Sequence, residues 1–240
     1  MKAKYIIVLV CCMFMFSCSN GQVSEGPIYD KVIPGQAEIE YSKIQPHKIE
    51  YKKMGGKMIY DLKKVNKYDK EVYEMNIYFG NESGTPDKIY FDINSLEYVG
   101  RVLDLKDYII DVSFKESVFK GSLKPKGESD YKPVDYNKEY PHNGFEPAII
   151  NYYIAALPLK MGYTASIPTF DLNGESSMIW ANIKVVDEEI VKVAGKKYDT
   201  WKVSSIGIRE KTIWISKDLG YAVKMKTKGA GGTWKLNKVF

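Results

Sequence analysis

Apolar and polar residues alternate along most of this chain with a period of two. Residues 75–79, 89–93 and 221–227 show the alternation clearly, and glycine-containing segments such as 54–57 and 80–84 separate the alternating runs. A strand with one buried face and one solvated face gives this pattern, and antiparallel sheets have such faces. The sequence therefore predicts a mainly β protein, built as one antiparallel sheet whose consecutive strands are joined by turns.

One segment near the middle has helical spacing instead. Residues 145–157 are predicted to form a single inserted amphipathic helix, with Asn143 as its N-cap three residues before Glu146 and with Pro158 after its end. Six apolar side chains lie on one stripe of that helix: Phe145, Ile149, Ile150, Tyr153, Ile154 and Leu157. The polar, proline-containing residues 124–140 before it are predicted to be a long loop.

The N-terminus has the layout of a secretory signal. Lysines in the first four residues precede an apolar run over 5–16, which is shorter than the roughly 20 residues of a membrane-spanning helix. The small residue Ser17 is followed by Cys18, and this pair resembles the lipobox of bacterial lipoproteins. An ordinary secreted protein with an incidental cysteine is the alternative. We expect three parts: a lipoprotein signal peptide (1–17), a lipidated tether (18–35) and a β-rich domain (36–240).

The cysteines fit this division. The chain has three, and because Cys11 and Cys12 lie in the expected signal peptide, the mature chain keeps Cys18 alone and can form no internal disulfide. Acyl chains such as palmitate on Cys18 would hold the protein on a bacterial membrane. Because Ser19 follows the cysteine, and not the aspartate that resembles an inner-membrane retention signal, we expect the outer membrane, at its periplasmic face or at the cell surface.

Charge and composition argue against nucleic acid as a partner. The formal net charge is +5, but the lysines occur in pairs such as 52–53 and 196–197 and not in long runs. Such pairs indicate solvated strand faces, not a nucleic-acid footprint. The 19 tyrosines suit a half-buried sheet, and stacking on sugars is the alternative interpretation.

The sequence shows no catalytic or metal-binding constellation. The two histidines, His47 and His142, stand apart, whereas a zinc site needs several ligands at short spacing. A G-x-S-x-G nucleophile elbow is absent. Paired carboxylates could serve a glycosidase, but we interpret residues 187–189 as a solvated strand end. We therefore predict a protein that is not an enzyme and that uses no cofactor and no metal.

Three segments of the second half resemble a known family. Residues 155–163, 195–203 and 211–218, in this order, resemble bacterial envelope proteins grouped as a domain of unknown function. That family is similar in fold to the lipoprotein-localisation factors, the carrier and the receptor of outer-membrane lipoproteins, which are open or half-closed β-barrels with helices in a hydrophobic cavity. The resemblance implies one strongly curved sheet. We expect its concave side to carry Ile49, Phe91, Val112, Trp201, Trp214 and Trp234, with Trp201 near Trp214.

Three functions compete on this sequence. The first is a non-catalytic binding protein for an apolar or amphiphilic envelope ligand, with the helix as a lid or plug. Its site would consist of Phe145, Ile149, Ile150, Tyr153, Ile154, Leu157, Trp201 and Trp214. The second is an envelope interaction protein that holds a protein or glycan partner, with the helix as plain core. The third is an envelope enzyme acting on glycan or lipid. A hollow beneath the helix would separate the first function from the second.

Overall fold

A computed structural model gives the arrangement of most of the chain. It describes residues 26–32, 39–128, 130, 132–140, 143–170, 178–207, 210–229 and 232–240. The expected signal peptide, Cys18 and part of the expected tether lie outside the described residues.

Fourteen strands of the described chain form one antiparallel sheet. Before the helix come β1 (His47–Lys53), β2 (Gly56–Lys67), β3 (Lys70–Phe79), β4 (Asp87–Asp92), β5 (Tyr98–Asp104), β6 (Tyr108–Lys115), β7 (Val118–Pro125) and β8 (Val134–Glu139). After it come β9 (Thr164–Phe170), β10 (Met178–Val193), β11 (Lys196–Ile206), β12 (Lys211–Ser216), β13 (Ala222–Thr227) and β14 (Gly232–Val239). The predicted mainly β fold with a single antiparallel sheet is confirmed.

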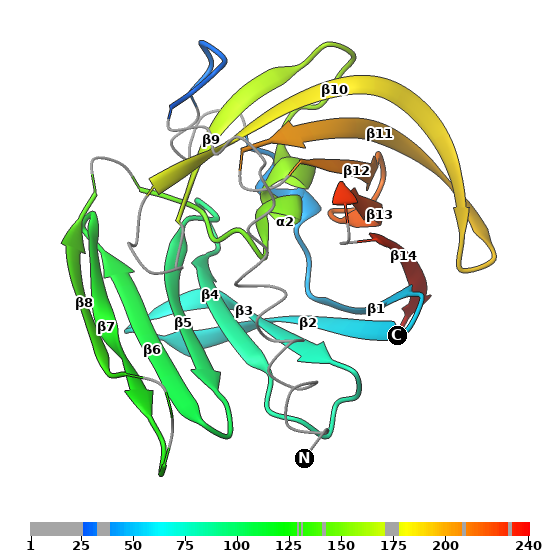
Figure 1. Cartoon of the computed structure of the whole chain (residues 1–240). Helices are drawn as coiled ribbons and strands as arrows, with labels where there is room; N and C mark the ends of the chain where they lie inside the picture. Colours follow the sequence, from blue (N-terminus) through cyan, green and yellow to red (C-terminus); the bar gives the residue numbers. More distant parts are fainter. Residues whose placement is uncertain are drawn as a thin grey trace.

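The sheet consists of two meanders joined at their ends. Strands β1 to β8 pair in sequence order, strands β9 to β14 do the same, and β1 pairs with β14. Strands β8 and β9 are therefore the two edges of the sheet. Along β6 buried residues alternate with less buried ones, as the period-two pattern predicts. Figure 1 shows the sheet curving around the helix, with β9 and β10 above it and β1 to β3 below it.

The two ends of the sheet meet through aromatic packing. The ring of Phe170, at the end of β9, lies within 4.8–6.1 Å, between centroids, of four rings from the β5–β8 side: Tyr98, Phe114, Phe119 and Tyr140. We call these five residues the seam cluster. Next to it, Phe145 forms a parallel bridge with Thr169, and its backbone N–H donates to the carbonyl of Pro168 at 2.9 Å. Among the described residues, side chains and one short bridge close the curve, and no strand ladder joins β8 to β9.

The helix is shorter and more deeply buried than the sequence predicts. Helix α2 covers Ile150–Ala156, and all seven of its residues are buried. The expected N-cap is wrong, because Ile149 stands at the N-cap position and the Asn143 side chain donates to Glu97 at 3.0 Å. The helix is also not amphipathic in its burial. The sheet surrounds it and buries every side of it, including Asn151. The predicted end of the helix before Pro158 is confirmed.

Two segments predicted to be irregular contact the sheet. The predicted loop 124–140 contains β8, a strand whose residues are mostly exposed. Alternation cannot reveal such a strand, because β8 lies at an edge and buries no face of its own. The part of the expected tether around Ile28 also lies on the domain, since the Ile28 N–H donates to Asn182 Oδ1 at 2.9 Å and Val32 bridges Ser166.

Candidate functional site

The predicted helix site is filled by its own side chains. Each apolar residue of the predicted stripe is at most 3% exposed: Phe145, Ile149, Ile150, Tyr153, Ile154 and Leu157. The rings of Phe145 and Tyr153 stack at 3.7 Å between centroids, and Asn151 Nδ2 donates to Met225 Sδ at 2.8 Å. The structure therefore brings these residues together as packed core. Neither of the two surface cavities described below is lined by them.

The two tryptophans of the predicted site lie on opposite faces of the sheet. Trp201 pairs with Ile215, whereas its neighbour Lys202 pairs with Trp214. Because residues directly opposed across a strand pair share a face and consecutive residues do not, the expected common concave position is wrong for Trp214. The Trp214 ring lies beneath the ammonium of Lys224, 3.7 Å from its centroid, and its Nε1–H donates to Glu189 Oε2 at 2.8 Å.

A buried charge cluster lies on the inner face of the sheet, and sequence reasoning did not identify it. Arg101 of β5 makes two hydrogen bonds to Asp87 of β4, with Nε to Oδ1 at 2.8 Å and Nη2 to Oδ2 at 2.5 Å. Its Nη1 also donates to Glu146 Oε1, just before the helix, at 3.3 Å. The residue that could have indicated the cluster is Arg101, a charged residue at a core-facing position. It pairs with the buried Ile89 on one side and with the buried Val112 on the other.

Burial determines the electrostatics of this cluster. The pKa of Glu146 is raised by burial and by the charge of Asp87, although Arg101 opposes the shift. Burial alone would lower the pKa of Arg101, but the two carboxylates outweigh it and raise the pKa above its usual value. The hydroxyl of the neighbouring Tyr98 has no hydrogen-bond partner among the described residues, and burial raises its pKa well above the usual range. Through Arg101, the cluster connects strands β4 and β5 to Glu146, just before the helix, inside the core.

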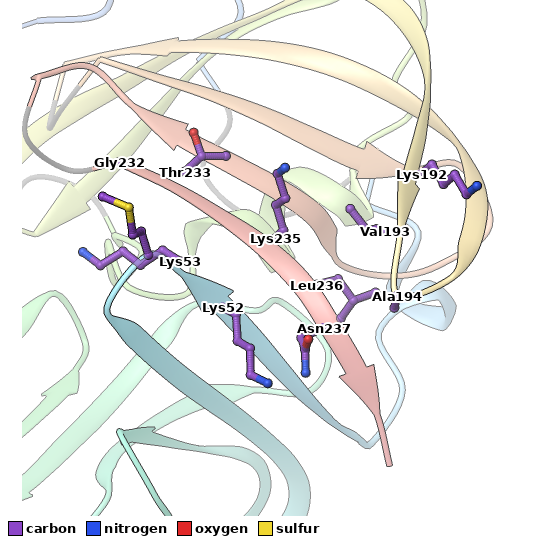
Figure 2. A pocket seen from close by; sticks show the side chains of 11 residues that line it. Lys52, Lys53, Lys192, Val193, Ala194, Gly232, Thr233, Lys235, Leu236 and Asn237 are labelled. Atoms are coloured by element: carbon purple, nitrogen blue, oxygen red, sulfur yellow. The ribbon is translucent and has the colours of Figure 1, made fainter.

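A basic groove opens on the surface of the other half of the sheet. Its volume is about 700 Å³, and it lies between the β1–β2 turn, strand β14 and the tip of the β10–β11 hairpin (Figure 2). Four lysines line it: Lys52, Lys53, Lys192 and Lys235. Its remaining lining residues are Met54, Val193, Ala194, Gly232, Thr233, Leu236 and Asn237, so no acidic side chain lines the groove.

The strand register places lysines of this region directly opposite one another. Lys52 of β1 pairs with Lys235 of β14, and Lys235 pairs with Lys224 of β13. Like charges directly opposed across strands are destabilising. Lys52 is 3.5 Å from Glu50, but within the described part of the chain Lys192 and Lys235 have no ion-pair partner. The pKa of Lys224 is lowered by its burial, an effect to which Lys235 and Lys202 add.

Other site types are less developed in the described residues. A second cavity, of about 140 Å³, lies beside Tyr98, Glu97 and Asn143. Within the described ranges, no group of three or more His, Cys, Asp or Glu side chains is placed to hold a metal ion. In the same ranges, every helix is too short or too polar to cross a membrane.

Comparison with known proteins gives one match. The model of a family described as a protein of unknown function, DUF3108, matches residues 56–236. The match runs from the start of β2 into β14 and so covers most of the sheet and the helix. No curated protein and no solved structure matches the chain.

Proposed function

The chain belongs to the DUF3108 family, and we propose that this member is a non-catalytic bacterial lipoprotein that binds its ligand on the surface of the sheet. One observation favours a binding site on the outer surface of the sheet over one in its interior. Every residue of α2 is buried in the curve of the sheet, while the larger groove lies outside it and is lined by strand and turn residues. An interior carrier site would instead need an apolar hollow. In this proposal the helix serves as core.

Membrane attachment is the first part of the proposal. It is supported by the basic start of the chain, the short apolar run and the Ser17–Cys18 pair. Cys18→Ala should leave an unprocessed precursor that takes up no labelled palmitate. Cys12→Ala is the matched control, because that cysteine lies inside the expected signal peptide, and this variant should be labelled normally. Undiminished labelling of Cys18→Ala would contradict the attachment.

The location in the outer membrane, at its periplasmic face or the cell surface, is the second part. It is supported by Ser19 in the position after the cysteine. Sucrose-gradient fractionation of the producing cells, with marker proteins for each membrane, tests it. The labelled protein should sediment with the outer-membrane marker. Recovery with the inner-membrane marker would contradict this part and leave the attachment itself intact.

The role of the helix as core is the third part. Ile150 is 3% exposed, so Ile150→Asp would bury an unpaired charge and cost about 4 kcal/mol or more. Ile190→Asp is the matched control, because Ile190 is 65% exposed, and its unfolding midpoint should stay unchanged. Urea denaturation followed by circular dichroism measures both. If Ile150→Asp folds normally and loses binding of a fluorescent fatty acid, the helix is a lid and the protein is a carrier.

A protein partner is the second candidate function, and the position of β8 at the end of the described sheet favours it. This strand ends the sheet, and its residues are mostly exposed. An unpaired strand edge offers backbone donors and acceptors to a strand of another chain. Asn137→Pro would remove one backbone N–H from β8. If this change abolishes recovery of a cross-linked envelope partner and leaves ligand binding unchanged, the interaction function is favoured.

A further inference from the structure

We infer that the basic groove binds phosphate-bearing headgroups of anionic lipids at the membrane surface. This inference rests on the proposed function for the location beside a membrane, and it adds the site and the chemistry of the ligand. The residues that line the groove are Lys52, Lys53, Met54, Lys192, Val193, Ala194, Gly232, Thr233, Lys235, Leu236 and Asn237.

The charge arrangement is the first support. Lys52 and Lys235 face each other in the strand register, and Lys192 from the hairpin tip lines the same groove. Lys52 and Lys235, directly opposed in the strand register, repel one another. Glu50, 3.5 Å from Lys52, offsets part of this repulsion, and no acidic side chain lines the groove itself. An anion with several oxygen acceptors would remove this repulsion and accept hydrogen bonds from more than one ammonium group. A phosphate group has that chemistry.

The shape of the groove is the second support. Lysines from three separate segments surround it, and Val193 and Leu236, which are 7% and 2% exposed, give it an apolar part. The side chain of Lys53 extends over the ring of Trp234, with its Nζ 4.7 Å from the centroid, and this contact restricts the position of its ammonium group. Figure 2 shows Lys53 and Lys192 on opposite sides of β14. Lysines on both sides of β14 therefore line the groove.

The rim of the groove selects a lipid over a soluble phosphate. Met54 stands at the tip of the β1–β2 turn, beside Lys53, and is fully exposed at 101%. Its neighbour Gly55 has φ +76°, the left-handed conformation that fixes this tight turn. An exposed apolar side chain next to lysines is the combination that inserts at the boundary between headgroups and acyl chains. A soluble anion would gain nothing from Met54.

Vesicle binding tests the inference. The protein is the chain from residue 18 onward with Cys18→Ser, which lacks the lipid and retains every described residue. It is mixed with phosphatidylcholine vesicles that contain or lack phosphatidylglycerol, and the bound fraction is measured by co-sedimentation. The groove variant is Lys192→Gln with Lys235→Gln. The control is Lys106→Gln with Lys120→Gln, which makes the same change in net charge at exposed lysines outside the groove.

The expected result is binding to the anionic vesicles that weakens with added salt. Each lysine near an anionic surface strengthens partitioning about five-fold, so the groove variant should bind roughly thirty-fold more weakly. The control should lose markedly less. Met54→Ser should weaken vesicle binding and leave the affinity for free glycerol phosphate unchanged.

Three results would overturn the inference. The first is equal binding to vesicles with and without phosphatidylglycerol. The second is an equal loss in the groove variant and the control, which would show a general charge effect. The third is competition by millimolar glycerol phosphate with no effect of Met54→Ser, which would assign the groove to a soluble phosphate. None of these results bears on palmitate labelling of Cys18, so failure of the groove and failure of the anchor are distinguishable.

Discussion

Replacement of Arg101 by methionine should destabilise the fold strongly. The change leaves Asp87 and Glu146 without their cation, and these side chains are 6% and 3% exposed. Breaking a buried ion pair by removing one partner costs about 3–5 kcal/mol. For a domain of this size each kcal/mol lowers the melting temperature by about 2–4 °C, so we expect a fall of roughly 6–20 °C. Arg101→Met keeps an apolar side chain of similar length, so that lost packing contributes little.

The pH dependence gives the destabilisation a distinct signature. Burial and Asp87 already raise the pKa of Glu146, and removal of Arg101 raises it further. The folded variant then holds a proton that the unfolded chain, with an ordinary glutamate pKa of about 4.3, releases. Because the folded state binds more protons in this range, its stability rises as the pH falls toward about 4.3. The deficit of Arg101→Met relative to the native protein should therefore narrow between pH 7 and pH 5.

Urea denaturation at pH 7 and pH 5, followed by circular dichroism, measures both effects. Lys120→Met is the control, because Lys120 is exposed and surface substitutions usually stay within about 0.5 kcal/mol. Asp87→Asn in the Arg101→Met background should restore part of the stability, since one uncompensated charge is removed. A loss below about 1 kcal/mol at pH 7, or a deficit that does not narrow at pH 5, would refute the assignment of a buried, mutually dependent charge cluster.

Two further predictions concern the closure of the sheet and the half-buried His47. Phe170→Ala should lower the free energy of unfolding by about 3–5 kcal/mol and speed hydrogen exchange along β9, because Phe170 is 1% exposed within the seam cluster. Phe240→Ala is the control, since Phe240 is 54% exposed, and it should change the stability little. If the β9 amides of Phe170→Ala exchange as slowly as those of the native protein, the seam cluster does not stabilise the β9 edge of the sheet. Burial lowers the pKa of His47, whose Nε2 lies 2.9 Å from the Tyr152 hydroxyl. As the pH falls, the unfolded chain therefore binds a proton at His47 before the folded protein does. The stability of the fold should consequently decrease below about pH 6.5. His47→Gln should make the free energy of unfolding depend less on pH in this range. An unchanged pH dependence, measured by urea denaturation at several pH values, would contradict this origin.

Local pattern was sufficient to predict the fold class. The alternation of residues such as those of β6, and the glycine turn at 54–57, depend on neighbouring residues alone, because a strand face repeats every two residues and a tight turn needs a left-handed residue. The family of unknown function was also visible in short segments of the second half. The lipid on Cys18 is likewise a sequence-level prediction, and it lies outside the described residues.

Tertiary structure decided the features that depend on register and on distant segments. Trp201 and Trp214 lie on opposite faces because Trp201 pairs with Ile215, the residue after Trp214, and composition does not determine this register. The helix became core because the sheet closed around it, which follows from the pairing of β1 with β14 and from the seam cluster. The basic groove combines segments around residues 53, 193 and 235, and the charge cluster joins Arg101 to Glu146. Contacts over such separations form only when the whole sheet is assembled, so no local pattern in the sequence encodes them.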